Sequence, residues 1–139
     1  MSVEAFFDTG ILVYAVSSAA EEQAKRKMSE QLINNVEFGI SGQVLAEFYT
    51  TVTRDIERPI SHADAVSWIA DLSELEVIEL DSDLVLAGAE LSAKYETSYW
   101  DGTIIAAAQR AGAKTLYSED LNHEQVFDDV VAINPYLDL

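Results

Sequence analysis

The sequence predicts an α/β fold in which a central, mostly parallel sheet is covered by helices on both faces. Short apolar runs alternate with longer segments of helical periodicity, as expected when helices connect parallel strands. The 139 residues suit one domain of ordinary size, and 49% of them are hydrophobic. Because no linker, repeat or low-complexity stretch interrupts the chain, residues 1–139 are predicted to form a single domain.

Five short apolar runs are predicted to be the strands of this sheet. Their nearly continuous apolar character is typical of parallel strands that are buried on both faces. The runs lie at residues 5–7, 38–40, 77–80, 115–118 and 130–133, and Asn134-Pro135 stops the last one.

Six helices are expected around these runs, because apolar residues recur there every three or four positions. Their expected limits are 11–16, after a turn at Asp8-Thr9-Gly10; 21–33; 42–54, capped by Ser41; about 61–72, where Ser61 and Asp64 form a capping box; 82–95, capped by Asp81 or Ser82; and 100–111, ended by Gly112. In parallel sheets, ligands bind beyond the carboxyl ends of the strands, so functional residues are expected there.

The sequence contains no cysteine, which excludes disulfides and thiolate metal sites. Its start, Met1-Ser2-Val3-Glu4, has no basic region followed by an apolar run, so no signal peptide is predicted. No window is long enough to span a bilayer. We therefore expect no membrane association, and the lack of cysteine fits a cytoplasmic location.

The chain is strongly acidic. Lys and Arg total 8 against 25 Asp and Glu, for a formal net charge of −17. A field of this sign repels nucleic-acid phosphates and attracts cations and basic proteins. Composition by itself therefore argues against a nucleic-acid substrate, unless metal ions or local basic patches offset the repulsion.

Four acids stand where the predicted fold could gather them. Asp8 follows the first strand, and Asp120 follows the strand at 115–118. Asp101 lies in the first turn of its helix, and Glu47 lies within a helix among apolar neighbours. Mg²⁺ and Mn²⁺ prefer oxygen ligands, and a site of this kind can activate water for phosphodiester hydrolysis. The pattern is compatible with a divalent-metal site.

Each of these acids also has a purely structural interpretation. Asp8 could cap a helix, and Asp101 could occupy a first turn because acids are favourable there. Glu47 could lie at the solvent edge of its helix. Asp120 could be a turn residue, with Glu119 beside it as a competitor for its role. Spacing alone leaves these alternatives open.

The residues around the four acids resemble the four motifs of PIN-domain nucleases, in the same order. The motifs lie at residues 6–15, 41–49, 98–108 and 116–121. Together they cover most of the chain, so the resemblance concerns the whole domain and implies a three-layer PIN-like fold.

Within that family, the sequence is most similar to VapC-type toxins of toxin–antitoxin pairs. The resemblance implies a Mg²⁺- or Mn²⁺-dependent endoribonuclease that cuts RNA, a homodimer, and a cognate antitoxin, which the acidic charge suggests is basic. By residue, it implies a metal site of Asp8, Glu47, Asp101 and Asp120, with Thr9, Ser118 and Glu119 beside these ligands.

Three residues depart from the family pattern. Gly10 stands where Asn is usual, so a polar side chain next to the expected site is missing. Gly102 replaces the common Ala and should weaken the helix start only slightly. Glu124 replaces a usual Gly and is expected to add negative charge near Asp120. Because of Gly10, a PIN-like binding module with weak or no catalysis is the alternative hypothesis.

Few basic residues are available to contact RNA. Arg54 and Arg58, at the end of the Glu47 helix, are the weak candidates. The run Lys25-Arg26-Lys27 is interpreted as a solvated helix face paired with nearby glutamates. Two other phosphate-handling classes are disfavoured: a haloacid-dehalogenase site needs an acid where Gly10 stands, and a receiver domain needs a Lys where Glu119-Asp120 occurs.

Overall fold

The computed structural model describes residues 2–139 and contains one sheet of six strands. The strand order is β3-β2-β1-β4-β6-β5, and only β5 and β6 are antiparallel. The strands are β1 (Ala5–Phe7), β2 (Phe38–Ser41), β3 (Glu76–Ile78), β4 (Thr115–Tyr117), β5 (Val126–Phe127) and β6 (Val130–Ile133). The predicted mostly parallel sheet is confirmed.

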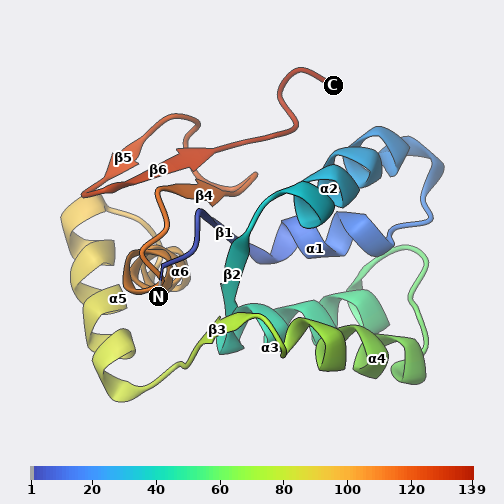
Figure 1. Ribbon diagram of the computed structural model, residues 1–139, viewed down its shortest axis with the longest axis horizontal. Coiled ribbons are helices and arrows are strands. Elements are labelled where there is room, and N and C mark those ends of the chain that lie inside the picture. The colour runs from blue at the N-terminus through green and yellow to red at the C-terminus, as the bar shows by residue number, and fades with distance from the viewer. Residues whose placement is uncertain (1) are drawn as a thin grey trace.

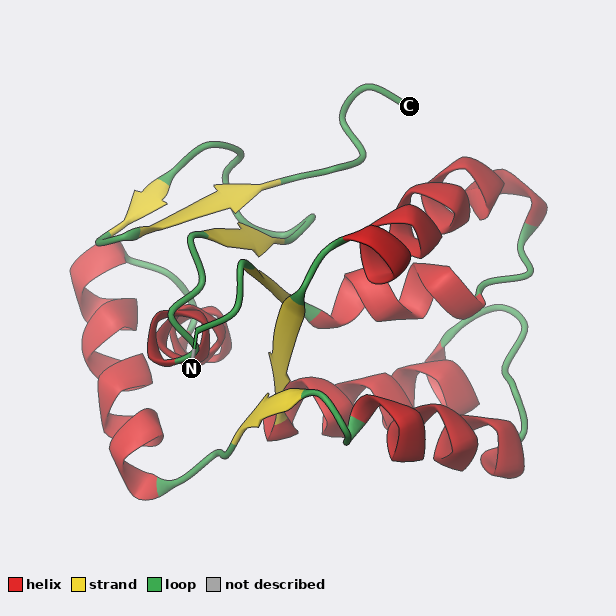
Figure 2. Ribbon diagram, viewed as in Figure 1, coloured by secondary structure: helices red, strands yellow, loops and turns green. Residues whose placement is uncertain are grey.

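Helices cover both faces of this sheet (Figure 1). The helices are α1 (Thr9–Val16), α2 (Gln23–Asn35), α3 (Gly42–Thr50), α4 (His62–Leu72), α5 (Ser82–Tyr95) and α6 (Tyr99–Arg110), with the short turns η1 (Ala20–Glu22) and η2 (Thr51–Asp55). In Figure 2 the yellow strands run between α5 and α6 on one side and α1 to α4 on the other. The predicted three-layer α/β class is therefore confirmed.

The centre of the sheet is the core of the protein. β1 lies between β2 and β4, with Phe6 opposite Leu116 in the register of the parallel pair. Phe6 and Phe7 are completely buried, and the Phe7 ring stacks on Phe38 with centroids 4.1 Å apart. Burial of such large side chains is the main stabilising contribution, about 1.5–3 kcal/mol for each.

Several predicted boundaries are wrong by a few residues, for local reasons. α1 begins at Thr9 rather than Ile11, because the Asp8 carboxylate accepts a hydrogen bond from Thr9 N at 2.8 Å. α2 begins at Gln23 after the η1 turn, rather than at residue 21. β3 ends at Ile78 rather than residue 80, and Asp81 rather than Ser82 caps α5 through Leu84 N.

The strand β5 was not predicted. It has only two residues, and it pairs with β6 through a tight turn in which Asp128 has a φ of 55°. So short a segment carries no periodic signal.

Among residues 2–139, every helix is too short or too polar to cross a membrane.

Candidate functional site

The four predicted acids lie on one cavity at the carboxyl edge of the sheet. β1 and β4 are neighbours although they are far apart in sequence, so Asp8 and Asp120 follow adjacent strands. α3 and α6 bring Glu47 and Asp101 to the same place. The cavity has a volume of about 350 Å³ and is lined by Asp8, Thr9, Gln43, Glu47, Thr50, Thr51, Trp100, Asp101, Ile104 and Asp120.

Asp8 is the most firmly held of the four carboxylates. It is 8% exposed, and its two oxygens accept hydrogen bonds from Thr9 N and from Ser118 Oγ, each at 2.8 Å. Asp8 therefore has both positions that the sequence allowed: it caps α1 and it lines the cavity.

Thr9 and Ser118 connect the acids to one another. Thr9 Oγ1 donates to Glu47 Oε1 at 2.7 Å, which joins α1 to α3. Ser118 Oγ, besides donating to Asp8, accepts from Asp120 N at 3.1 Å. These two hydroxyls therefore fix the relative positions of groups from three segments.

Burial and mutual repulsion make the negative charge unfavourable in this cavity. Burial, with smaller contributions from Asp120 and Glu47, raises the pKa of Asp8 to about 6 despite its two hydrogen bonds. Partial burial, followed by the charges of Asp120 and Glu47, also raises the pKa of Asp101. Such shifts are common at functional sites, and a bound cation would relieve them.

The chemistry of the lining fits a hard divalent cation. It offers four carboxylates, and the amide oxygen of Gln43 is buried there without any hydrogen-bond donor. As the side chains lie, no three acidic or imidazole groups among residues 2–139 converge on one ion position. Grouped carboxylates repel one another in the absence of a cation, so ion binding would have to draw them together.

Glu119 takes a different position from Asp120. Its carboxylate accepts hydrogen bonds from Tyr14 Oη and Lys25 Nζ, both at 2.5 Å. It lines a neighbouring cavity of about 290 Å³ that also includes Asp8, Gly10 and Asp120. The sequence suggested that Lys25 lies on a solvated helix face, and this is wrong, because Lys25 pairs with Glu119 beside the cavity. Arg26 does pair with a nearby glutamate, Glu30, at 3.8 Å.

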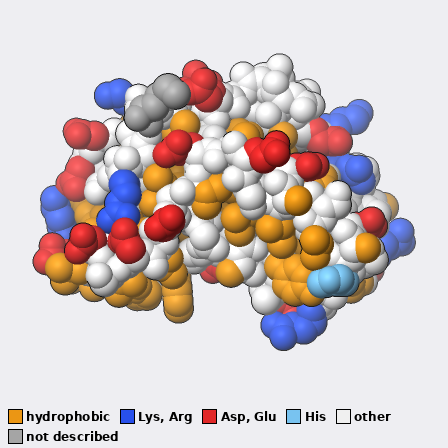
Figure 3. All heavy atoms as spheres, turned by 60° about the horizontal axis from the view of Figure 1, so that its bottom comes forward, with side chains coloured by type: hydrophobic (Ala, Val, Ile, Leu, Met, Phe, Trp, Pro, Cys, Tyr) orange, Lys and Arg blue, Asp and Glu red, His pale blue; other side chains and the backbone are white. Residues whose placement is uncertain are grey.

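The two arginines predicted to contact RNA lie outside the carboxylate cavity. Arg54 is exposed and pairs with its neighbour Asp55 at 2.9 Å. Arg58 lines a separate cavity together with Glu57 and residues of η1. On the face drawn in Figure 3, acidic side chains are spread widely and the blue Lys and Arg side chains lie mainly toward the edges.

The three departures from the family pattern have different structural consequences. A Cβ at Gly10 would have no neighbour within 4 Å, so a side chain fits there. A Cβ at Gly102 would lie 2.3 Å from the Gly88 carbonyl oxygen, so this glycine is required by the contact between α5 and α6 and is not a minor change. Glu124 has a φ of 67°, which favours glycine, and its carboxylate pairs with His123 at 3.1 Å rather than lining the cavity.

Five lining residues were missed by sequence reasoning: Gln43, Thr50, Thr51, Trp100 and Ile104. Thr51 begins the π-helical turn η2, a rare conformation that often occurs at functional sites. Trp100 precedes Asp101 and is 56% exposed, which is unusual for so large an apolar side chain. Gln43, Trp100 and Ile104 had a sequence signal, since all three lie within the motifs at residues 41–49 and 98–108.

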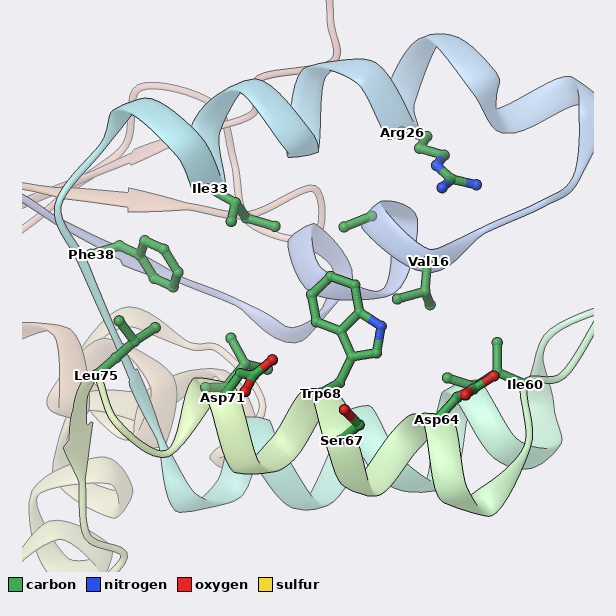
Figure 4. Close-up of a pocket in the computed structure, with 12 residues that line it drawn as sticks. Val16, Arg26, Ile33, Phe38, Ile60, Asp64, Ser67, Trp68, Asp71 and Leu75 are labelled. Carbon is green, nitrogen blue, oxygen red and sulfur yellow. The ribbon is translucent and has the colours of Figure 1, made fainter.

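A larger cavity, of about 520 Å³, lies between α2 and α4 (Figure 4). Trp68 rises from α4 toward α2 in its centre, and Ile33, Phe38 and Leu75 form apolar walls. Asp64 and Asp71 line it from α4, and Arg26 lies above them on α2. We call this feature the α2–α4 groove.

Comparison with known sequences gives one family. The family model of the PIN domain matches residues 5–128. No curated protein sequence is significantly similar to the chain.

Several solved structures share the fold. A chain of a toxin–antitoxin complex from Klebsiella pneumoniae has a TM-score of 0.71 and 18% identity, over 96% of this chain and 98% of that one. The Mycobacterium tuberculosis toxin VapC20, described as cleaving the sarcin–ricin loop, has a TM-score of 0.67 and 20% identity over 84% and 92%. VapBC2 from Rickettsia felis, bound to promoter DNA, has a TM-score of 0.60 and 22% identity over 92% and 96%.

Proposed function

Because this chain belongs to the PIN domain family, we propose that it is a Mg²⁺- or Mn²⁺-dependent endoribonuclease. The observation that carries the proposal is the meeting of four carboxylates on one cavity whose described lining includes no Lys or Arg. The likeness to VapC20, described as a sarcin–ricin loop cleaving toxin, favours RNA as the substrate class. The residues that would hold the cation are Asp8, Glu47, Asp101 and Asp120. When bound, it would act as a Lewis acid on the phosphodiester and lower the pKa of the attacking water.

The four acids would contribute in different ways because they are held differently. Asp8 and Glu47 have defined positions before anything binds, through Thr9 and Ser118. Asp101 is half-buried and Asp120 is exposed, so these two carboxylates are free to turn toward a ligand. The phosphodiester would enter over this exposed side of the cavity, which is the side open to solvent.

The direct test is cleavage of total RNA by the purified protein with Mn²⁺ or Mg²⁺, with and without EDTA. We expect EDTA to stop cleavage and an excess of Mn²⁺ to restore it. Asp101→Asn should lower the rate by about a hundredfold or more, because it removes a cation ligand without changing the side-chain shape. Undiminished metal-dependent cleavage by Asp101→Asn would rule out the assigned site.

A second candidate function is a binding module with weak or no catalysis. It is motivated by Gly10, which leaves open space beside Asp8 where the family has a polar side chain. We expect Gly10→Asn to raise the cleavage rate by about 10- to 100-fold, because the amide would orient a carboxylate or water. Gly10→Ala is the matched control, since it fills the same space without a polar group and should give no such gain. Equal rates for both variants would show that Gly10 does not limit catalysis.

A basic antitoxin is proposed as the natural partner. The similar Klebsiella pneumoniae structure is a toxin–antitoxin complex, and the net charge of −17 would attract a basic protein. The α2–α4 groove, with its apolar walls and two acids, suits a basic amphipathic segment. Co-purification with a small basic protein that is lost after Asp64→Lys with Asp71→Lys would support this, whereas unchanged co-purification would place the partner elsewhere.

Two further parts of the proposal concern assembly and location. A homodimer is supported by Val85 and Leu86 of α5, which are 40% and 61% exposed. Sedimentation of the wild type and of Leu86→Glu would test it, with a monomeric wild type as the contrary result. The cytoplasmic location stays a prediction, and fractionation of cells that express the protein would test it.

A further inference from the structure

The carboxylate cavity offers almost nothing basic to an RNA backbone. No Lys or Arg is among the described residues that line it or the adjoining cavity at Gly10. Of the 8 Lys and Arg residues, five are engaged in ion pairs with acids: Lys25, Arg26, Arg54, Lys94 and Arg110. Recognition of RNA at this cavity therefore needs a contact other than phosphate–cation pairing.

Trp100 is the residue that can supply such a contact. It lies in the first turn of α6, lines the carboxylate cavity, and is 56% exposed. Its backbone is held by α6, and Gln43 Nε2 donates to its carbonyl oxygen at 3.5 Å. The edge-to-face contact with Tyr99, at a centroid distance of 5.0 Å, orients the indole. The ring is thus held in place beside Asp101 while much of its surface remains open.

On this basis we propose that the Trp100 indole stacks on an unpaired nucleobase next to the cleaved phosphodiester. The inference rests on the proposed ribonuclease function and adds its substrate preference, which is single-stranded or looped RNA. Stacking is insensitive to the acidic field, because a nucleobase carries no charge. A base within a duplex is already stacked on its neighbours and presents no free face, so double-stranded RNA would be a poor ligand.

Binding can be measured without cleavage, because the protein contains only two tryptophans. The probe is a six-nucleotide single-stranded oligoribonucleotide of mixed sequence, added to a Trp68→Phe protein that also carries Asp8→Asn. The remaining fluorescence then comes from Trp100. We expect the single strand to quench it and the same sequence in a duplex to leave it unchanged. Absence of quenching at a high concentration of the single-stranded oligonucleotide would overturn the proposal.

Cleavage kinetics give the second test. Trp100→Leu should raise KM by about tenfold to a hundredfold and change kcat little, whereas Trp100→Phe, which keeps an aromatic face, should stay near the wild type. An abasic nucleotide next to the cleaved bond should raise KM for the wild type and cause no further rise for Trp100→Leu. Leu137→Ala removes another exposed apolar side chain, 58% exposed, and serves as the control.

Other results would contradict either the stacking contact of Trp100 or the proposed reaction. Equal KM values for wild type and Trp100→Leu would overturn the proposal. If, in addition, Trp100→Leu disrupts dimers, the indole belongs to a protein interface. Quenching of Trp100 by the oligonucleotide, together with no RNA cleavage by the wild-type protein in the presence of Mn²⁺, would reject the proposed reaction and leave the stacking contact intact.

Discussion

Replacing Asp8 with Asn is expected to reduce RNA cleavage by about a hundredfold or more and to stabilise the metal-free protein at pH 7. Catalysis should be lost because a cation ligand becomes neutral. Stability should rise because the carboxylate is 8% exposed and lies near Glu47 and Asp120. An amide oxygen can still accept from Thr9 N, so the cap of α1 is retained.

The stabilisation should depend on pH in a defined direction. The pKa of Asp8 is about 6 in the folded protein, whereas the ordinary value of 3.8 applies to the unfolded chain. A group whose folded pKa is raised adds stability that is fully present below pH 4 and is lost as the pH rises through 6. The metal-free wild type should therefore lose about 2.4 kcal/mol from this group between pH 4 and pH 7.

The comparison with Asp8→Asn isolates this contribution. Hydrogen bonds and ion pairs lower the pKa values of Asp81 and Asp128, so these two groups add stability as the pH rises. Their contribution is the same in the wild type and in Asp8→Asn, so it cancels in the comparison. Urea unfolding from pH 4 to pH 7 should show the Asn variant gaining about 2.4 kcal/mol over the wild type as the pH rises. Added Mn²⁺ should stabilise only the wild type. A stability difference that does not change with pH would contradict the assigned burial penalty.

Replacing Gly102 with Ala is expected to destabilise the fold by about 3 kcal/mol, although Ala normally favours a helix by about 1 kcal/mol over Gly. The new Cβ would lie 2.3 Å from the Gly88 carbonyl oxygen and 2.9 Å from Ser92 N, both backbone atoms of α5. A Cβ on Gly88 would likewise lie 2.8 Å from the Thr103 Cα. The two helices can accept either methyl group only by moving apart.

Urea unfolding measures this effect, with Gly42→Ala as the matched control. Gly42 likewise lies in the first turn of a helix, α3, but its Cβ would have no neighbour within 4 Å, so this change should be neutral or slightly stabilising. Since α6 carries Asp101 at its start, the Gly102 variant should also lose RNA cleavage. Equal stability of the two alanine variants would show that the α5–α6 contact is less tight than described.

The sequence by itself determined the layers of this protein and the order of its elements. Continuous apolar runs and helical periodicity are local properties, so the five longer strands and all six helices could be recognised from them. Caps are local as well: Ser41, Ser61 and Ser98 each accept a hydrogen bond from the backbone within the first turn of the helix that follows. Asp8 and Asp120 were chosen at strand ends, Asp101 at a helix start and Glu47 within a helix. The fold places all four on one cavity.

The tertiary structure alone decided what surrounds those acids. Glu119 and Asp120 are adjacent in sequence, yet Lys25 and Tyr14, about 100 residues away, hold only Glu119. The need for Gly102 arises from α5, and the two-residue strand β5 exists only because β6 is beside it. The open indole of Trp100 likewise depends on where α6 meets the cavity. Periodicity reports which face of an element is buried, but the distance between two side chains depends on how separate elements cross, and no local pattern carries that information.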